Sequence, residues 1–172
     1  MVFDFATTPI PPSHLPPEFW FVEWSADIVE PHADVLHRSF RDDMDGAVFT
    51  SFRQYNNCLR LIELLADSPA FLPEATLLAA HGDPEGVFEY VANIQGLKMS
   101  DEVGMIQNVA VLPEYRRRGI GQALVQEALR GFSKAKVDRV TLEATAENLT
   151  AVNLYRRIGF TTFHVYLREI FD

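Results

Sequence analysis

The segment whose residue types most clearly suggest a chemical function is the run Arg-Arg-Arg-Gly-Ile-Gly at residues 116–121. It lies between an apolar run at 106–112 and an amphipathic stretch at 120–132, so we predict a turn from a strand into a helix. Two glycines leave space in front of backbone N–H groups, and a helix N-terminus adds positive partial charge. This combination predicts an anion site suited to a diphosphate, with a basic connection that binds nothing as the alternative. The run comprises Arg116, Arg117, Arg118, Gly119, Ile120 and Gly121.

A second pair of functional side chains follows further along the chain. After a predicted strand at 138–144, Asn148 is placed to cap a helix that ends at Gly159, where a left-handed stop is expected. Asn148 and Tyr155 are seven positions apart, which is two helical turns, so both project from the same side. The sequence therefore predicts an amide and a phenol along one line near the glycine turn.

These motifs together resemble the GCN5-related N-acetyltransferase (GNAT) superfamily, which transfers an acetyl group from acetyl-CoA to an amine. The resemblance covers roughly residues 75–168 and rests on four elements in order. The run 108–121 is similar to that superfamily's strand and Arg-x-x-Gly-x-Gly diphosphate loop. Asn148 and Tyr155 match its later CoA-contacting asparagine and its general acid, and 159–160 matches the turn into its late strand. Residues 1–74 carry no such match.

The resemblance implies a fold and a set of site residues. The expected fold is α/β (α+β), a mixed, mostly antiparallel twisted sheet that splays at the CoA cleft and has helices on both faces. Acetyl-CoA and a primary amine would form a ternary complex, and the amine would attack the thioester directly. Tyr155 would protonate the departing thiolate. The expected cofactor contacts are Asn148, residues 116–121, and the backbone groups of Val109, Ala110 and Val111, where an N–H would stabilise the oxyanion.

The general base is less clearly marked. Relatives place Glu or His on the central strand, but the matching positions here are Met105 and Gln107. Glu143, five residues before Asn148, matches the base of ribosomal-protein N-terminal acetyltransferases, and it is our candidate. Glutamate at a strand end is also typical of plain solvated surface. Three further residues stay open as bases acting through water: His81, Asp101 and Glu102.

Composition sets limits on the class of protein. A chain of 172 residues fits one domain, 1–172, with an extended proline-rich arm at 1–17. Residues 1–100 carry five Lys/Arg against fifteen Asp/Glu, whereas 101–172 carry ten against nine, within a net charge of −9. The acidic half suits a cationic amine or simply keeps the surface soluble, and it argues against nucleic acid as a partner. The sequence has one cysteine, its histidines show no metal-ligand spacing, and neither a leader nor a long apolar span is visible. We therefore expect a cytoplasmic protein that binds no metal and does not contact a membrane.

The remaining elements follow from periodicity. We predict a first strand at 19–24, helices at 31–40 and 51–66, and a hairpin of strands 75–81 and 87–95 with Phe88, Tyr90, Ala92 and Ile94 on one face. A final strand at 160–170 would, by the resemblance, pair in a homodimer. The acidic stretch 42–45 could border the acceptor site or be a solvated loop.

Two rival functions stay open. One is a non-catalytic CoA-binding regulatory or interaction module, favoured by the absent bases at 105 and 107. The other is a structural α/β domain that binds no CoA. A calcium loop at 41–52 fails because it begins with Arg41 and has Phe52 at position twelve, and a Walker nucleotide loop fails because Gly121 is followed by Gln-Ala.

Overall fold

The computed structural model describes residues 1–40 and 50–165. Within these residues, six strands form one sheet in the order β1-β6-β5-β4-β3-β2. Neighbouring strands are antiparallel except β5 and β6, which are parallel. This is the mixed, mostly antiparallel sheet that the sequence predicts. The strands are β1 (Val2–Asp4), β2 (Phe19–Glu23), β3 (Leu77–Gly82), β4 (Phe88–Lys98), β5 (Val103–Val111) and β6 (Arg139–Leu142).

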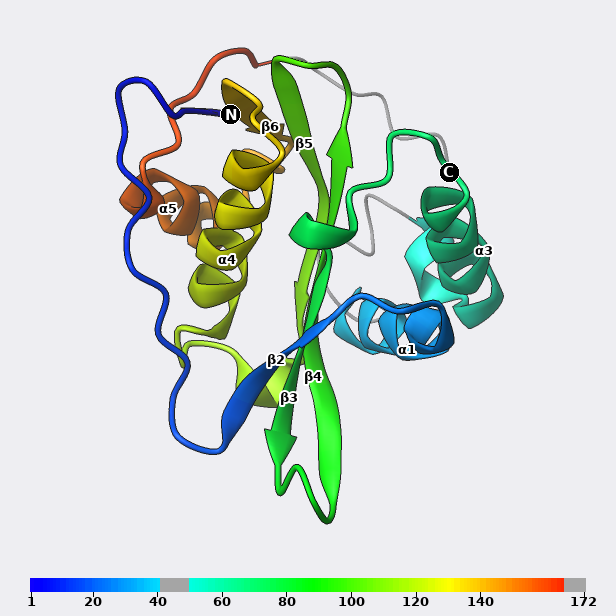
Figure 1. The fold of residues 1–172 in the computed structure, drawn as a ribbon. Helices are drawn as coiled ribbons and strands as arrows, with labels where there is room; N and C mark the ends of the chain where they lie inside the picture. Colours follow the sequence, from blue (N-terminus) through cyan, green and yellow to red (C-terminus); the bar gives the residue numbers. More distant parts are fainter. Residues whose placement is uncertain (41–49, 166–172) are drawn as a thin grey trace.

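Helices cover both faces of the sheet, as predicted. Helices α4 (Ile120–Lys134) and α5 (Leu149–Ile158) lie on one face, and α1 (Val29–Phe40) and α3 (Tyr55–Ala66) lie on the other (Figure 1). Each face buries its own apolar core, one around α4 with Leu124, Leu129 and Phe132, the other around α1 and α3 with Leu36 and Ile62. The sheet is thus the middle of three layers.

Most predicted elements are confirmed with shifted ends. The glycine turn does connect β5 to α4, and Asn148 caps α5, which Gly159 ends in the left-handed conformation with φ of 119°. The first predicted helix begins at Val29 and not at Pro31, and the second begins at Tyr55 after a 3₁₀ turn at Thr50–Arg53.

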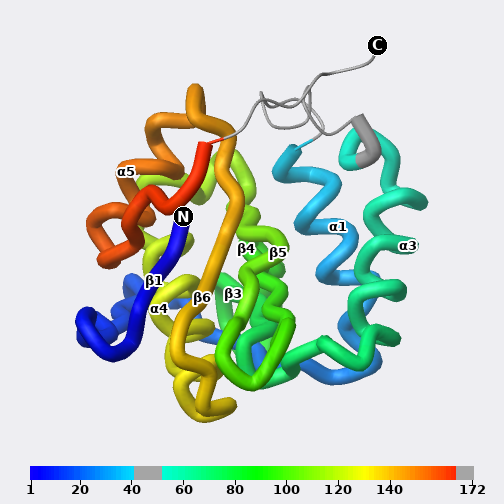
Figure 2. Tube along the Cα trace, turned by 90° about the horizontal axis from the view of Figure 1, so that it is seen from above, coloured from blue at the N-terminus to red at the C-terminus, as the bar shows by residue number. Residues whose placement is uncertain are grey.

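The arm at 1–17 is not wholly extended coil, because its first residues form a strand. Val2 and Asp4 pair with Thr141 and Arg139 at the outer edge of β6. The prolines that argue against pairing start only at Pro9, so they do not prevent it. In Figure 2 the N-terminus lies beside β6 and α5. The rest of the arm packs along α4, whose Arg130 donates to Pro11 O at 3.0 Å, and then leads into β2.

Two further expectations need correction. Of the predicted final strand, Thr161 makes only an isolated bridge to Val2, residues 162–165 are not strand, and the rest lies outside the described residues. The homodimer through that strand stays a prediction. The alternation along β4 is also interrupted, since the register shifts between Ala79 and Ala80, and Tyr90 packs on the α1 face while Ala92 and Ile94 pack on the α4 face.

Some features of the sequence are not structurally described or not found. The acidic stretch 42–45 and most of the rejected calcium loop lie outside the described residues. Within 1–40 and 50–165, no helix has the length and apolarity to cross a bilayer. In the same ranges no three His, Cys, Asp or Glu side chains gather closely enough to hold a metal ion.

Candidate active site

The two parallel strands of the sheet separate halfway along β5. Pairing between β5 and β6 ends at Ile106 and Leu142, whereas pairing between β5 and β4 continues to Val111 opposite Ala92. Residues 107–111 of β5 therefore have β4 on one side and no paired strand of the described chain on the other. We call this unpaired side of β5 the seam.

Backbone direction decides which groups face the seam. The Leu112 N–H donates to Val91 O at 2.9 Å, so Leu112 faces β4. Because N–H directions alternate along a strand, Ala110 also turns its N–H toward β4, while Val109 and Val111 turn theirs toward the seam. Of the three predicted backbone contacts, two are thus placed to meet a ligand there. Ala110 instead contributes a buried methyl group to the α1 face.

The glycine turn exposes a set of backbone N–H groups at the start of α4. Gly119 is the N-cap, with φ of 83°, and Arg117 also has a positive φ of 60°. Among the described residues, no acceptor takes a hydrogen bond from the N–H groups of 117–122. No heavy atom lies within 4 Å of where a Cβ on Gly119 would be, so the space before these groups is open. A helix of fifteen residues adds its dipole, so the turn has the geometry and the positive partial charge that anion binding requires.

The three arginines of the turn have different surroundings. Arg116 Nε donates to Val111 O at 3.0 Å, and its Nη2 donates to Ser39 O at the end of α1 at 2.8 Å. Arg118 lies over the Tyr115 ring, 5.2 Å from its centroid, and is exposed, as is Arg117. Arg116 therefore braces the turn against α1, whereas Arg117 and Arg118 extend into solvent.

Truncating Arg116 to alanine is expected to lower the free energy of unfolding by about 2 kcal/mol, because two carbonyls lose a charged donor. Urea unfolding measures the change. Arg118→Ala is the matched control and should cost less than about 1 kcal/mol, since Arg118 is exposed. Equal losses in the two variants would contradict the bracing role.

Helix α5 places both of its predicted residues. The Asn148 Oδ1 accepts from Ala151 N at 3.1 Å, so this side chain caps the helix. Tyr155 is buried, with 8% exposure, and its ring meets Phe160 edge-on with centroids 5.9 Å apart. Tyr155 belongs to the same core as Ile120, the first residue of α4. The Tyr155 side chain therefore lies on the same face of the sheet as α4, the helix that follows the glycine turn.

The candidate bases are spread over the sheet. Glu143 directly follows Leu142, where the pairing with β5 ends, and it is exposed. Asp101 pairs with Lys98 at 3.1 Å and Glu102 with Arg139 at 3.7 Å, at the start of β5 and so at the opposite end from the seam. His81 stacks on Phe19 with centroids 4.4 Å apart and lies 3.4 Å from the Tyr115 hydroxyl. Of these groups, Glu143 is the one that directly follows the point where β5 and β6 separate.

A buried polar set on the α1 face was missed in the sequence. The Asn93 Nδ2 donates to His32 O at 2.7 Å, and the Gln95 Nε2 lies 2.9 Å from His32 Nδ1. Asn108 on β5 pairs in register with Gln95 on β4. The signal was the pair of amides at alternate positions of an otherwise apolar strand, which a period-2 pattern should assign to one face.

Burial lowers the pKa of His32 from 6.5 to about 3, because the charged ring would lose its hydration. An unfolded His32 binds a proton near pH 6 while the folded one does not, so its contribution to stability is complete above pH 6.5 and is lost as pH falls toward 3. We expect the free energy of unfolding to drop by about 2 kcal/mol more between pH 6 and pH 4 in the wild type than in His32→Gln. Urea titrations at several pH values measure this difference. A slope unchanged in His32→Gln would contradict the assignment.

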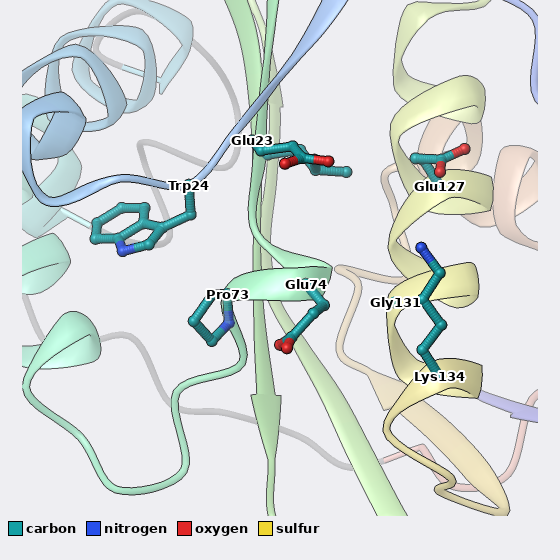
Figure 3. Close-up of a pocket in the computed structure, with 8 residues that line it drawn as sticks. Glu23, Trp24, Pro73, Glu74, Glu127, Gly131 and Lys134 are labelled. Atoms are coloured by element: carbon teal, nitrogen blue, oxygen red, sulfur yellow. The ribbon is translucent and has the colours of Figure 1, made fainter.

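A separate hollow lies near the other end of α4 (Figure 3). Lys134 and Gly131, at the C-terminal end of that helix, line it together with Trp24 and Glu74. Glu127, also in its wall, already bonds Ser13 and Arg130 at 2.9 Å each. This hollow is distant along α4 from the glycine turn and is not part of the candidate active site.

The chain is similar to a known family and to several known proteins. The model of the acetyltransferase (GNAT) family matches residues 55–160. An N-alpha-acetyltransferase of Sulfurisphaera tokodaii is 36% identical over 70 residues, which are 40% of this chain and 42% of that protein. The chain spans less than half the length of the curated relatives it matches.

Solved structures share the fold. The GCN5-related N-acetyltransferase of Sphaerobacter thermophilus superposes with a TM-score of 0.70 at 24% identity, over 92% of this chain and 45% of that one. The PaiA N-acetyltransferase of Thermoplasma acidophilum, solved in complex with coenzyme A, gives a TM-score of 0.66 at 17% identity, over 86% and 92% of the two chains. With the family model matching more than half of its residues, this chain belongs to the acetyltransferase (GNAT) family.

Proposed function

We propose that this chain transfers the acetyl group of acetyl-CoA to a primary amine, and that the α-amino group of a peptide or protein N-terminus is the favoured acceptor. The observation that carries the proposal is the open set of N–H groups at 117–122 beside the end of the seam. The favoured acceptor follows from the N-alpha-acetyltransferase of Sulfurisphaera tokodaii, whose sequence is similar here.

The residues present fit acetyl-CoA. The diphosphate would bind the N–H groups of 117–122, where a left-handed glycine leaves room for close approach. Arg117 and Arg118 are exposed and would add charge. The pantetheine arm would extend along the seam, where Val109 and Val111 offer unused N–H groups. This direction brings the thioester toward the point at which β5 and β6 part.

The reaction would proceed by direct attack. The amine loses a proton, for which Glu143 is the proposed acceptor, and forms a C–N bond to the thioester carbon. The carbonyl oxygen becomes an oxyanion, which a seam-facing N–H of Val109 or Val111 stabilises. Collapse then breaks the C–S bond, and Tyr155 gives the sulfur its proton. Cys58 has no part in this scheme, because it is buried and its thiol pKa is raised to about 11 by burial.

The test is CoA release from acetyl-CoA with a panel of amines, combined with calorimetric titration of CoA. The panel contains peptides with free N-termini, the same peptides with blocked N-termini, spermidine and an aminoglycoside. We expect micromolar CoA binding and release that depends on a free peptide N-terminus. Tight CoA binding with no release for any amine would instead support a non-catalytic CoA-binding module, and failure to bind CoA would support a structural domain.

A further inference from the structure

Asn108 lies at a special position on β5. It is two residues beyond Ile106, the last residue paired with β6, and one residue before Val109, whose N–H faces the seam. Asn108 shares its face of the sheet with Ala110, which packs in the core of α1 and α3. Its side chain therefore leaves the sheet at the strand separation, on the face opposite α4.

That face is where an acceptor has to approach. Figure 2 shows α4 and α5 on one side of the sheet and α1 and α3 on the other. The glycine turn that would hold the diphosphate starts α4, so acetyl-CoA enters from the α4 side. An amine that attacks the thioester carbon must then arrive from the side that CoA does not fill, which is the side of Asn108. The inference therefore rests on the proposed function.

The buried polar set fixes which way the Asn108 amide points. A neutral histidine carries one ring N–H, and the Gln95 Nε2 donates to His32 Nδ1, so the Nε2 of His32 bears that hydrogen. Because the Nε2 of Gln95 donates to His32, the Oε1 of Gln95 remains a buried acceptor without a partner in the described chain. Directly opposite in register, the Nδ2 of Asn108 is a buried donor for which residues 1–40 and 50–165 provide no acceptor.

These two orphaned atoms complement each other. Buried donors and acceptors are rarely left unpaired in folded proteins, and a small rotation or one ordered water joins such a pair. Once the Nδ2 of Asn108 points inward to Gln95, its Oδ1 must point the other way. Asn108 is only 9% exposed, so the outward oxygen has little water to bind and retains its capacity to accept.

We propose that the Oδ1 of Asn108 accepts a hydrogen bond from the amine that is to be acetylated, and that this bond directs the lone pair of the amine nitrogen at the thioester carbon. Gln95 and His32 act as positioning residues for the Oδ1 of Asn108. Asn108 takes no proton, because a carboxamide is not basic. The proton still leaves to Glu143, and the N–H that remains on nitrogen is the one held by Asn108. This residue thus supplies a polar contact on a strand where Met105 and Gln107 offer no base.

The test compares acetyl-transfer kinetics of variants, using the panel amine that the wild type acetylates fastest. Asn108→Ala should lower kcat/KM for the amine by about ten- to a hundredfold, as expected for one hydrogen bond near a developing charge. CoA affinity by calorimetry should change by less than about twofold.

A double-mutant cycle separates positioning from simple packing. In the otherwise wild-type protein, Gln95→Leu should lower kcat/KM for the amine, because the Asn108 amide is no longer held in one orientation. In the Asn108→Ala background the same change should have little effect, since no amide is left to orient. Gln126→Ala, which removes a buried amide from α4, is the stability control and should leave amine kinetics unchanged.

Three results would overturn the inference. They are an unchanged amine kcat/KM in Asn108→Ala, a matching loss of CoA affinity, or a Gln95→Leu effect of equal size in both backgrounds. Each leaves the wild-type activity intact and so spares the proposed function. If the wild type acetylates no amine at all, the proposed function fails first and this inference fails with it.

Discussion

Replacing Gly119 with valine is expected to weaken CoA binding at least about a hundredfold. Gly119 has φ of 83°, a conformation that costs a β-branched residue roughly 1–2 kcal/mol. The new side chain would also enter the open space before the N–H groups of 117–122, where the diphosphate has to approach. Calorimetric titration of CoA measures the loss.

Two control variants separate backbone strain from blocked approach. Asparagine adopts the left-handed conformation readily, so Gly119→Asn should keep the wild-type melting temperature and still bind CoA weakly. Lys136, just beyond the other end of α4, has φ of 60°. Lys136→Val imposes similar strain away from the turn and should lower stability without changing CoA affinity. Wild-type affinity in Gly119→Asn would show that close approach is not what matters.

Replacing Tyr155 with phenylalanine is expected to lower kcat by about a hundredfold or more while CoA affinity stays within about twofold. The ring of Tyr155 is buried in the α4 core against Phe160, and phenylalanine keeps that packing. Only the hydroxyl is lost, and with it the proton for the departing thiolate. Steady-state kinetics with a saturating amine and calorimetry with CoA give the two quantities.

Tyr90→Phe is the matched control, because it removes a phenol hydroxyl from the opposite face of the sheet. It should leave both kcat and CoA affinity near wild type. If Tyr155→Phe instead lost CoA affinity and kcat in equal proportion, Tyr155 would belong to the cofactor pocket. If it lost neither, another group protonates the thiolate.

The parts of the fold that the sequence predicted are those with a local cause. Gly119 and Gly159 both take positive φ, and glycine adopts that conformation at little cost. Asn148 bonds an amide three residues away, so its capping role needs no tertiary context. The turn into α4 and both ends of α5 follow from such short-range effects, and their positions were predicted well.

The parts that were missed depend on partners far along the chain. Val2–Asp4 become a strand only because β6 offers a free edge more than a hundred residues later. Nothing in the composition of those three residues specifies that edge. Likewise Tyr90 leaves the face predicted by alternation because β3 and β4 shift register near Ala79. A bulge changes the face of every later residue and has no clear signature in a single strand.

The candidate site shows the same division. Arginines at 116–118 predict positive charge correctly, but only the folded chain shows that Arg116 is used by Ser39 and Val111 carbonyls. The buried set of His32, Gln95 and Asn108 combines a helix with two strands, so no local pattern could bring it together. Residue type indicated the charge of the turn, whereas the topology of the fold determined which groups lie beside it.

The pairing of β1 with β6 also constrains how the protein is made. Val2–Asp4 are synthesised well before their partner residues 139–141, from which most of the described chain separates them. The first strand must therefore wait unpaired until β6 has been made, and pairing the two is a long-range step. Until then Val2–Asp4 have no partner strand, so a nascent chain stalled before residue 139 would offer an unpaired strand that other chains could join.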